Sequence, residues 1–171
     1  YYSGTCSSSL DETRLGFEEF GGEVHAFSPA YKDSEIGEYV RMCSHLSFNS
    51  ISQWEQHRGT ILNSEKTVSC GLRVNPEHCE VETAIYNPCR PGSRLGIKAE
   101  ELENFDFEGI GGLHFHALCE NNADALERTL AAFEERFSRY IDGMKWVNFG
   151  GGHHITRKDY DTEPVSYTHL T

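Results

Sequence analysis

A glycine turn is the first feature of the chain with the residue types to do chemistry. Residues 145–154 read KWVNFGGGHH, an apolar run that stops on Gly150, Gly151 and Gly152. Glycines at such a turn let main-chain N–H groups approach an anion closely, and a ring of these donors is how many folds hold a phosphate. Three glycines after a strand also form a plain flexible bend. The turn therefore predicts either a phosphate site or only a bend.

Two histidines alternate in LHFH, residues 113–116, so His114 and His116 point to the same face of a strand. Three interpretations stay open on the residues alone. The pair can fill a polar layer inside a barrel. It can ligate zinc, as H-x-H motifs do in barrel hydrolases, together with His153 and His154 at another strand end. His116 can also lie flat against an aromatic cofactor, where a neutral imidazole orients the ring without adding charge, while the glycines hold its phosphate.

Arg73 is a third candidate, at the end of the apolar stretch 68–75. Its guanidinium is a fixed cation with five hydrogen-bond donors, which adds to the cofactor interpretation of His116. The alternative is an interior ion pair that serves only the fold.

Composition describes an ordinary globular domain of 171 residues with a formal net charge of -12. This charge argues against nucleic-acid binding, which needs a basic face, and it suits a cationic small molecule. No stretch approaches the ~20 apolar residues of a membrane span, and the first residues do not follow a signal-peptide pattern. Six cysteines occur without a C-x-x-C pair, which is typical of reduced thiols and predicts a cytoplasmic protein.

Short apolar runs alternate with amphipathic helical stretches along the chain. The predicted strands are 5–7, 24–28, 46–49, 68–75, 112–118 and 146–149, and the predicted helices are 9–20, 32–44, 53–62, 98–105 and 123–141. We expect Ser9 to cap the first helix and Asn121 or Asn122 to cap the last. The segment 77–96 reads as a long loop of the kind that is usually functional.

Six strand–helix alternations with near-continuous apolar strands predict an α/β fold with parallel strands inside and helices outside. Six is two short of an eight-stranded barrel, so the expected fold is a partial (β/α)8 TIM-type barrel. The polar and glycine-rich residues follow the carboxyl ends of the strands, where such folds place their sites.

Seven motifs in order resemble the carboxynorspermidine/carboxyspermidine decarboxylases, a family with the pyridoxal-phosphate fold related to alanine racemase and ornithine decarboxylase. They are TCSSSLDE (5–12), RLGFEEFGGE (14–23), FNSIS (48–52), GLRVNP (71–76), SRLGI (93–97), LHFH (113–116) and WVNFGGGHH (146–154). The resemblance runs from about Gly4 to Asp161. It implies loss of carbon dioxide from carboxynorspermidine or carboxyspermidine, giving norspermidine or spermidine in polyamine biosynthesis.

The resemblance also implies pyridoxal 5'-phosphate as cofactor and assigns roles to several residues. The implied cofactor-binding residues are His116, Gly150, Gly151, Gly152, Arg73 and Cys119. His116 would stack on the pyridoxal ring, the glycines would hold the phosphate, and Arg73 would lie beside the ring. Cys119 falls where related decarboxylases have a small polar residue near the phosphate. Segment 77–96 matches the family's loop over the mouth of the site.

Other parts of the family pattern fall outside this chain. The family's cofactor lysine lies upstream, at the end of the first barrel strand, and the acidic partner of the pyridine nitrogen lies downstream. None of the chain's five lysines matches, so we name no catalytic residue and expect the 171-residue chain to be inactive by itself. The full-length protein is expected to be a homodimer that takes a small polyamine-type substrate, and no metal is expected. We expect the chain to divide into a partial barrel domain, residues 1–161, and an atypical tail, residues 162–171.

Several choices stay open at this point. The substrate can be carboxynorspermidine, carboxyspermidine or, outside this pair, diaminopimelate. One alternative function is a metal-dependent barrel hydrolase that uses His114 and His116. Another is a non-catalytic pyridoxal-phosphate-binding barrel, which would need a lysine of its own at a strand end.

Overall fold

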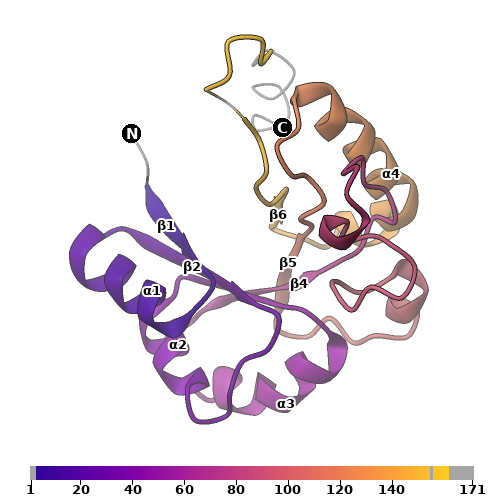
Figure 1. The fold of residues 1–171 in the computed structure, drawn as a ribbon. Coiled ribbons are helices and arrows are strands. Elements are labelled where there is room, and N and C mark those ends of the chain that lie inside the picture. The colour runs from indigo at the N-terminus through magenta and orange to yellow at the C-terminus, as the bar shows by residue number, and fades with distance from the viewer. Residues whose placement is uncertain (1–2, 155, 162–171) are drawn as a thin grey trace.

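The computed structural model describes residues 3–154 and 156–161, which form a curved parallel sheet with helices on its outer side (Figure 1). The sheet has six strands in the order β1-β2-β3-β4-β5-β6, and each pairs in parallel with the next. The predicted tail, 162–171, lies outside the described residues. The prediction of a partial barrel with parallel strands inside and helices outside is confirmed.

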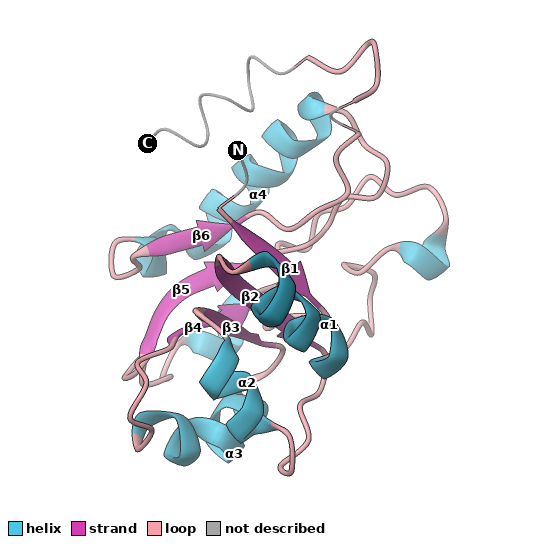
Figure 2. Cartoon of the chain, turned by 90° about the vertical axis from the view of Figure 1, so that its left-hand side faces the viewer, coloured by secondary structure: helices cyan, strands magenta, loops and turns pink. Residues whose placement is uncertain are grey.

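The elements follow the predicted alternation. The strands are β1 (Gly4–Ser7), β2 (Glu23–Ser28), β3 (His45–Phe48), β4 (Ser69–Arg73), β5 (Ile110–His114) and β6 (Trp146–Asn148), and the α-helices are α1 (Leu10–Leu15), α2 (Ile36–Met42), α3 (Ile51–Leu62) and α4 (Ala123–Ile141). A π-helical stretch, η1 (Gly16–Phe20), continues α1, and 3₁₀ turns form η2 (Ala84–Tyr86) and η3 (Ala99–Leu102). Figure 2 shows these helices arranged around the outside of the strands.

Side-chain caps explain where two of the helices begin. The Ser9 hydroxyl accepts a hydrogen bond from the Glu12 amide at 3.3 Å, and the Ser50 hydroxyl accepts one from the Gln53 amide at 3.2 Å, so each satisfies an amide that lacks a partner within its helix. The prediction for Ser9 is therefore confirmed. Asn122 does occupy the cap position of α4, but its side chain makes no capping hydrogen bond.

The core lies between the sheet and the helices, because alternate strand residues point outward to the apolar faces of the helices. Buried side chains from the strands include Leu46, Phe48, Leu72 and Leu113, and those from the helices include Trp54, Leu126, Phe133 and Phe137. The last three repeat at helical spacing along α4, which places the apolar stripe of that helix against the sheet.

The inner face of the sheet is filled at one end by a single large side chain. Trp146, the first residue of β6, lies across Gly71 and Gly112, which are register partners on β4 and β5. A Cβ atom at either glycine would overlap the indole ring. The indole nitrogen donates to the Ser69 hydroxyl at 2.8 Å. These glycines are therefore packing positions for Trp146.

The predicted fifth strand, 112–118, was wrong in its limits, because β5 is Ile110–His114. The main chain of β4 explains the early end. The Val74 amide donates the last hydrogen bond to β5, at the His114 carbonyl 2.7 Å away, and Val74 then pairs with Ile97. Residues beyond His114 thus lose their neighbour on that side, and His116 lies past the end of the strand.

Two predicted helices were also too long. Residues 98–105 form only the 3₁₀ turn η3, since hydrogen bonds there close over three residues, as between the Phe105 amide and the Leu102 carbonyl at 3.1 Å. The predicted helix 32–44 is shortened to α2 (Ile36–Met42).

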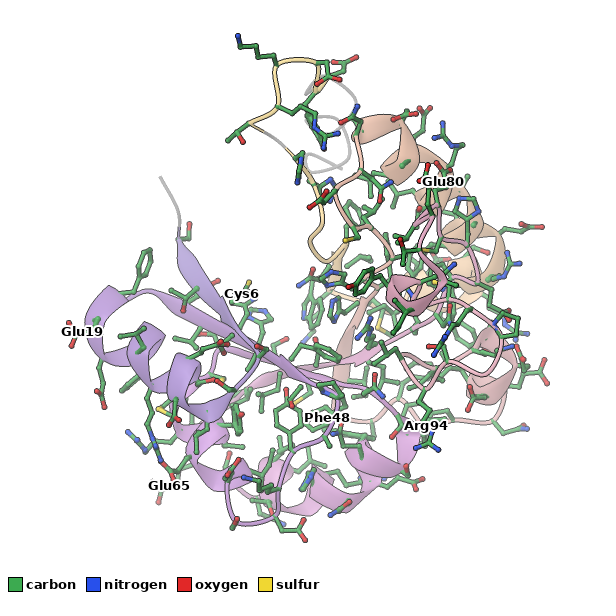
Figure 3. All side chains as sticks on the ribbon, in the orientation of Figure 1. Cys6, Glu19, Phe48, Glu65, Glu80 and Arg94 are labelled. Carbon is green, nitrogen blue, oxygen red and sulfur yellow. The ribbon has the colours of Figure 1, made fainter. Side chains whose placement is uncertain are left out.

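Segment 77–96 is a long connection, as predicted, and it is tied down at several points. Arg128 on α4 donates to Glu80 at 2.7 Å, and Figure 3 labels Glu80 beside this helix. The Cys79 thiol donates to the Ala117 carbonyl at 2.9 Å. At the far end of the segment, the Asn49 side chain binds the Arg94 carbonyl and the Gly96 amide, at 2.8 and 3.1 Å. The segment is therefore held against β3 and α4.

No helix of the described residues is long and apolar enough to cross a membrane.

Candidate functional site

A cavity of about 350 Å³ lies on the inner face of the sheet. Its volume falls in the range of small-molecule sites. The residues around it come from β1, β2, β3, β5 and β6, from the start of α1 and from the turns after β1, β5 and β6: Cys6, Ser7, Ser8, Glu12, His25, Ala26, Phe27, His45, Ser47, His114, His116, Trp146, Asn148, Gly150 and Gly151. Figure 3 labels Cys6 on β1 at one side of this space.

The two predicted histidines share this cavity. Their ring centroids are 6.4 Å apart, although only His114 belongs to the strand. Phe115, between them, is buried on the opposite side against Phe133 and Phe149. The alternation predicted from LHFH thus continues for two residues beyond His114, the last ladder position.

His114 is buried and electrically neutral. Burial, together with the positive charge of Arg73 and the nearby His116, lowers its pKa to about 3. Its Nδ1 atom is buried and has no hydrogen-bond partner among the described residues, and its ring meets the Phe27 ring edge-on at 5.1 Å. An unpartnered buried nitrogen is costly, so it marks a place where a ligand would add a missing contact.

His116 faces the open part of the cavity. Burial lowers the pKa of its imidazole, and the positive charge of Arg73 and the nearby His153 act in the same direction. A neutral imidazole is therefore favoured at this position, as the cofactor interpretation requires.

Arg73 is a buried cation with no carboxylate partner among the described residues. Burial lowers its pKa to about 10. One Nη atom donates to the His116 carbonyl at 3.2 Å, and the guanidinium lies 4.7 Å from the centre of the Phe27 ring. The interior ion pair that the sequence left open is thus not formed within the described part of the chain. Arg73 instead holds the backbone of His116.

The glycine turn begins where β6 ends. Gly150 and Gly152 have φ angles of 73° and 94°, in the left-handed region that favours glycine. A Cβ atom on Gly150 would come within 2.8 Å of the His116 Cα atom, and one on Gly152 would overlap the Leu118 carbonyl. The glycines are needed because the turn packs directly on the backbone of residues 115–119.

The amides of the turn are oriented by its neighbours. The Asn148 side chain accepts from the Gly150 amide at 2.8 Å. The hydrogen bonds between described residues leave the amides of Gly151 and Gly152 unused. Two main-chain donors at a left-handed turn form a concave group of the kind that binds phosphate.

Pyridoxal phosphate fits these residues on three counts. Unused amides at the turn suit its phosphate, the neutral His116 ring suits its aromatic ring, and the buried Nδ1 of His114 and the charge of Arg73 add polar groups nearby. Only three of the six predicted cofactor-binding residues line the cavity, namely His116, Gly150 and Gly151. The other three, Arg73, Gly152 and Cys119, lie behind or beside them. The Cys119 thiol is exposed, and its amide donates to the Asn121 side chain at 2.8 Å.

The four histidines of the metal interpretation do not converge. Within the described residues, a group of three ligating side chains forms elsewhere, at Glu23, His25 and His45. His153 contacts the Tyr160 hydroxyl at 3.0 Å, and His154 contacts Arg157 at 2.6 Å.

Sequence reasoning missed the cavity residues of the first three strands and of the start of α1, and it missed Trp146 and Asn148 of β6. Glu12 accepts hydrogen bonds from the Ser8 amide and hydroxyl, at 2.7 and 2.9 Å, and both residues line the cavity. Asn148 was also missed, although a polar residue in an otherwise apolar strand just before three glycines was a usable signal. None of the five lysines of the chain lines the cavity.

Two known decarboxylases are similar to this chain in sequence. The chain is 48% identical over 165 residues to the carboxynorspermidine/carboxyspermidine decarboxylase of Campylobacter jejuni, a match that covers 96% of this chain and 42% of the relative. The chain is homologous to part of that decarboxylase. It is also 43% identical over 161 residues to a carboxyaminopropylagmatine decarboxylase of Synechocystis, covering 94% of this chain and 41% of the relative. The chain thus spans less than half the length of the curated relatives it matches.

Solved structures agree with the sequence comparison. A crystal structure of carboxynorspermidine decarboxylase from Campylobacter jejuni, complexed with norspermidine, superposes with a TM-score of 0.86 at 44% identity, covering 98% of this chain and 42% of that one. A diaminopimelate decarboxylase superposes with a TM-score of 0.73 at 16% identity, covering 96% of this chain and 42% of that one, which shows a shared fold. No family model matches the chain.

Proposed function

We propose that this chain is the larger part of the cofactor-binding barrel of a pyridoxal-phosphate-dependent decarboxylase that acts on a carboxylated polyamine. The observation that carries the proposal is that the glycine turn and His116 line one cavity, and that the Gly151 and Gly152 amides of this turn have no partner among the described residues. The 48% identity to a carboxynorspermidine/carboxyspermidine decarboxylase supports it.

The glycine turn would bind the cofactor's phosphate, with Gly151 and Gly152 donating their amides. The Asn148 side chain, which holds the Gly150 amide, keeps the turn in the conformation that exposes the next two donors. Gly150 and Gly152 bring the turn against residues 115–119, so the phosphate would sit close to His116.

His116 would lie against the cofactor's ring. Arg73 supports this role in two ways, since it holds the His116 carbonyl and its charge helps to keep the imidazole neutral. A neutral ring orients the cofactor without competing with the charge on the pyridine nitrogen. When bound, pyridoxal phosphate supplies an electron sink for the carbanion left by loss of carbon dioxide.

The proposed substrate is a small cation with a carboxyl group. Relatives are named for carboxynorspermidine, carboxyspermidine and carboxyaminopropylagmatine, and one was crystallised with norspermidine. The net charge of -12 suits a cationic substrate.

Three further features belong to the proposal. Residues 1–161 are proposed as one barrel domain, the whole protein as a cytoplasmic homodimer, and Cys119 as a neighbour of the phosphate. Six free thiols support the reducing compartment.

Binding can be tested on the 171-residue chain with pyridoxine 5'-phosphate, which has the ring and phosphate of the cofactor but no aldehyde to react with surface lysines. We expect one molecule to bind per chain, measured by isothermal titration calorimetry, and inorganic phosphate to compete. Gly152→Ala and His116→Ala should each weaken binding by at least about tenfold, which corresponds to ~1.4 kcal/mol. Gly143→Ala is the matched control, because a Cβ atom there would meet only the Tyr140 carbonyl, at 3.7 Å.

Activity is tested on the extended reading frame. We expect release of carbon dioxide from carboxynorspermidine, carboxyspermidine or carboxyaminopropylagmatine, and no release by the 171-residue chain. The frame should also supply a lysine at an upstream strand end and an acidic residue at a downstream one. Binding that is equal in Gly152→Ala and Gly143→Ala would contradict the proposed cradle, whereas an extended protein inactive on all three compounds would contradict the proposed reaction.

A further inference from the structure

Glu23, His25 and His45 converge at the end of the sheet opposite the glycine turn. Glu23 and His25 are two residues apart at the start of β2, so their side chains point to the same face. His45 begins β3 and is the register partner of His25. Two parallel strands thus present three ligating side chains at adjacent positions of one face.

The ligating atoms are already close together. One nitrogen or oxygen atom of each residue lies within 4.8 Å of the others, and it is the one such group of three among the described residues. The His25 Nε2 atom is 3.1 Å from the Glu23 carboxylate, and the two imidazole rings stack with centroids 4.2 Å apart. A tetrahedral zinc ion bonded to each ligand at ~2.1 Å needs ligand atoms about 3.4 Å apart, so side-chain rotations that shorten the longest of these separations would close the site.

The surroundings of His45 favour a ligand. Its Nδ1 atom is buried and has no hydrogen-bond partner among the described residues. The Trp146 ring packs edge-on against the imidazole at 5.4 Å and shields one side of it, while Glu23 stays accessible to solvent.

We propose that Glu23, His25 and His45 bind a divalent transition-metal ion of the zinc class. Two imidazoles and one carboxylate suit Zn²⁺, Co²⁺ or Ni²⁺, whereas Mg²⁺ and Ca²⁺ prefer oxygen ligands throughout. The three protein ligands leave a fourth position for water. The site lies at the far end of the cavity from the glycine turn, and the proposal does not depend on the proposed decarboxylase function.

Co²⁺ is a better probe than Zn²⁺, because its absorbance distinguishes binding at this site from binding at the six free thiols of the chain. We expect Co²⁺ added to the 171-residue chain at neutral pH to bind with one equivalent and to give visible d–d absorbance without an intense near-ultraviolet thiolate band. His45→Gln should abolish this binding, and Glu23→Gln should weaken it by at least about tenfold. His78→Gln is the control, since His78 also pairs with a glutamate, Glu80, at 3.2 Å but belongs to no group of three ligating side chains within the described part of the chain.

Tryptophan fluorescence gives a second readout that needs no ligand variant. Bound Co²⁺ should quench Trp146, whose ring contacts His45, and Trp146→Phe should remove most of the quenching while buried Trp54 remains. No quenching at saturating Co²⁺, a thiolate band, or binding that His45→Gln leaves intact would each overturn the proposal.

Discussion

His114 is a base that the fold keeps from taking up a proton. It lies between Phe27 and His116 on the inner face of the sheet, with the guanidinium of Arg73 nearby. Burial is the largest cause of its lowered pKa, and the positive charge of Arg73 adds to it. The same surroundings that keep the imidazole neutral must therefore make the folded state sensitive to acid.

The sign of this effect follows from proton binding. The folded pKa of His114 is about 3, below its ordinary value of 6.5, so between these values the unfolded chain binds a proton that the folded chain refuses. The free energy of unfolding should fall as the pH drops below 6.5 and should be unaffected by this group above it. Between pH 7 and pH 5 the loss should be roughly 2 kcal/mol for this one residue.

Urea unfolding of the chain and of His114→Gln at the two pH values measures this loss. The variant should lose roughly 2 kcal/mol less than the parent, because its side chain cannot take up the proton. Equal pH dependence in the parent and in His114→Gln would contradict a buried neutral imidazole.

Helices α3 and α4 differ in how their first turns are stabilised, although both begin after a residue that commonly caps helices. The Ser50 hydroxyl of α3 accepts from the Gln53 amide, whereas the Asn122 side chain of α4 accepts from Arg157 at 3.2 Å. The long apolar face of α4, with Leu126, Phe133 and Phe137 buried, orders that helix without a side-chain cap. Packing can replace a cap, because tertiary contacts supply most helical stability.

The two positions should therefore respond differently to alanine. Ser50→Ala is expected to lower the free energy of unfolding by about 1 kcal/mol, because the Gln53 amide loses its partner. Asn122→Ala should cost less than about 0.5 kcal/mol, because only a contact to an exposed arginine is lost. Chemical denaturation monitored by circular dichroism compares them, and an equal cost at both positions would contradict the difference in capping.

The whole sheet has two edges, β1 and β6, each with one neighbour among the described strands. Unpaired strand edges expose main-chain donors and acceptors that a second chain can pair with. Exposed apolar side chains near β1, on Leu15, Phe17 and Phe20, add to this tendency. We expect the 171-residue chain to associate with itself as its concentration rises.

A charge on the edge strand should reduce this association. Cys6 on β1 is exposed, and Cys6→Lys places a lysine there, which is a common natural protection of strand edges. Glu55→Gln, an exposed position on α3, changes the net charge by the same amount and serves as the control. Light scattering after gel filtration should show a lower mass for Cys6→Lys alone. A monomer at all concentrations would contradict the expectation.

The sequence by itself determined the local elements and their order. The period of apolar residues predicted α4 with its limits, and the short apolar runs predicted all six strands of a parallel sheet, because these patterns depend on neighbours only a few residues apart. The glycines after β6 and the alternation of His114 and His116 also marked the cavity that the structure contains. These features follow from backbone geometry within single segments.

Only the tertiary structure decided which distant residues meet. The early end of β5 depends on Val74 leaving it for Ile97, and the packing of Trp146 depends on the register of Gly71 with Gly112. The pairing of His25 with His45, which joins Glu23 in a cation site we propose, is likewise a matter of strand register. No local period encodes these contacts, because register is set by the packing of the whole sheet against its helices.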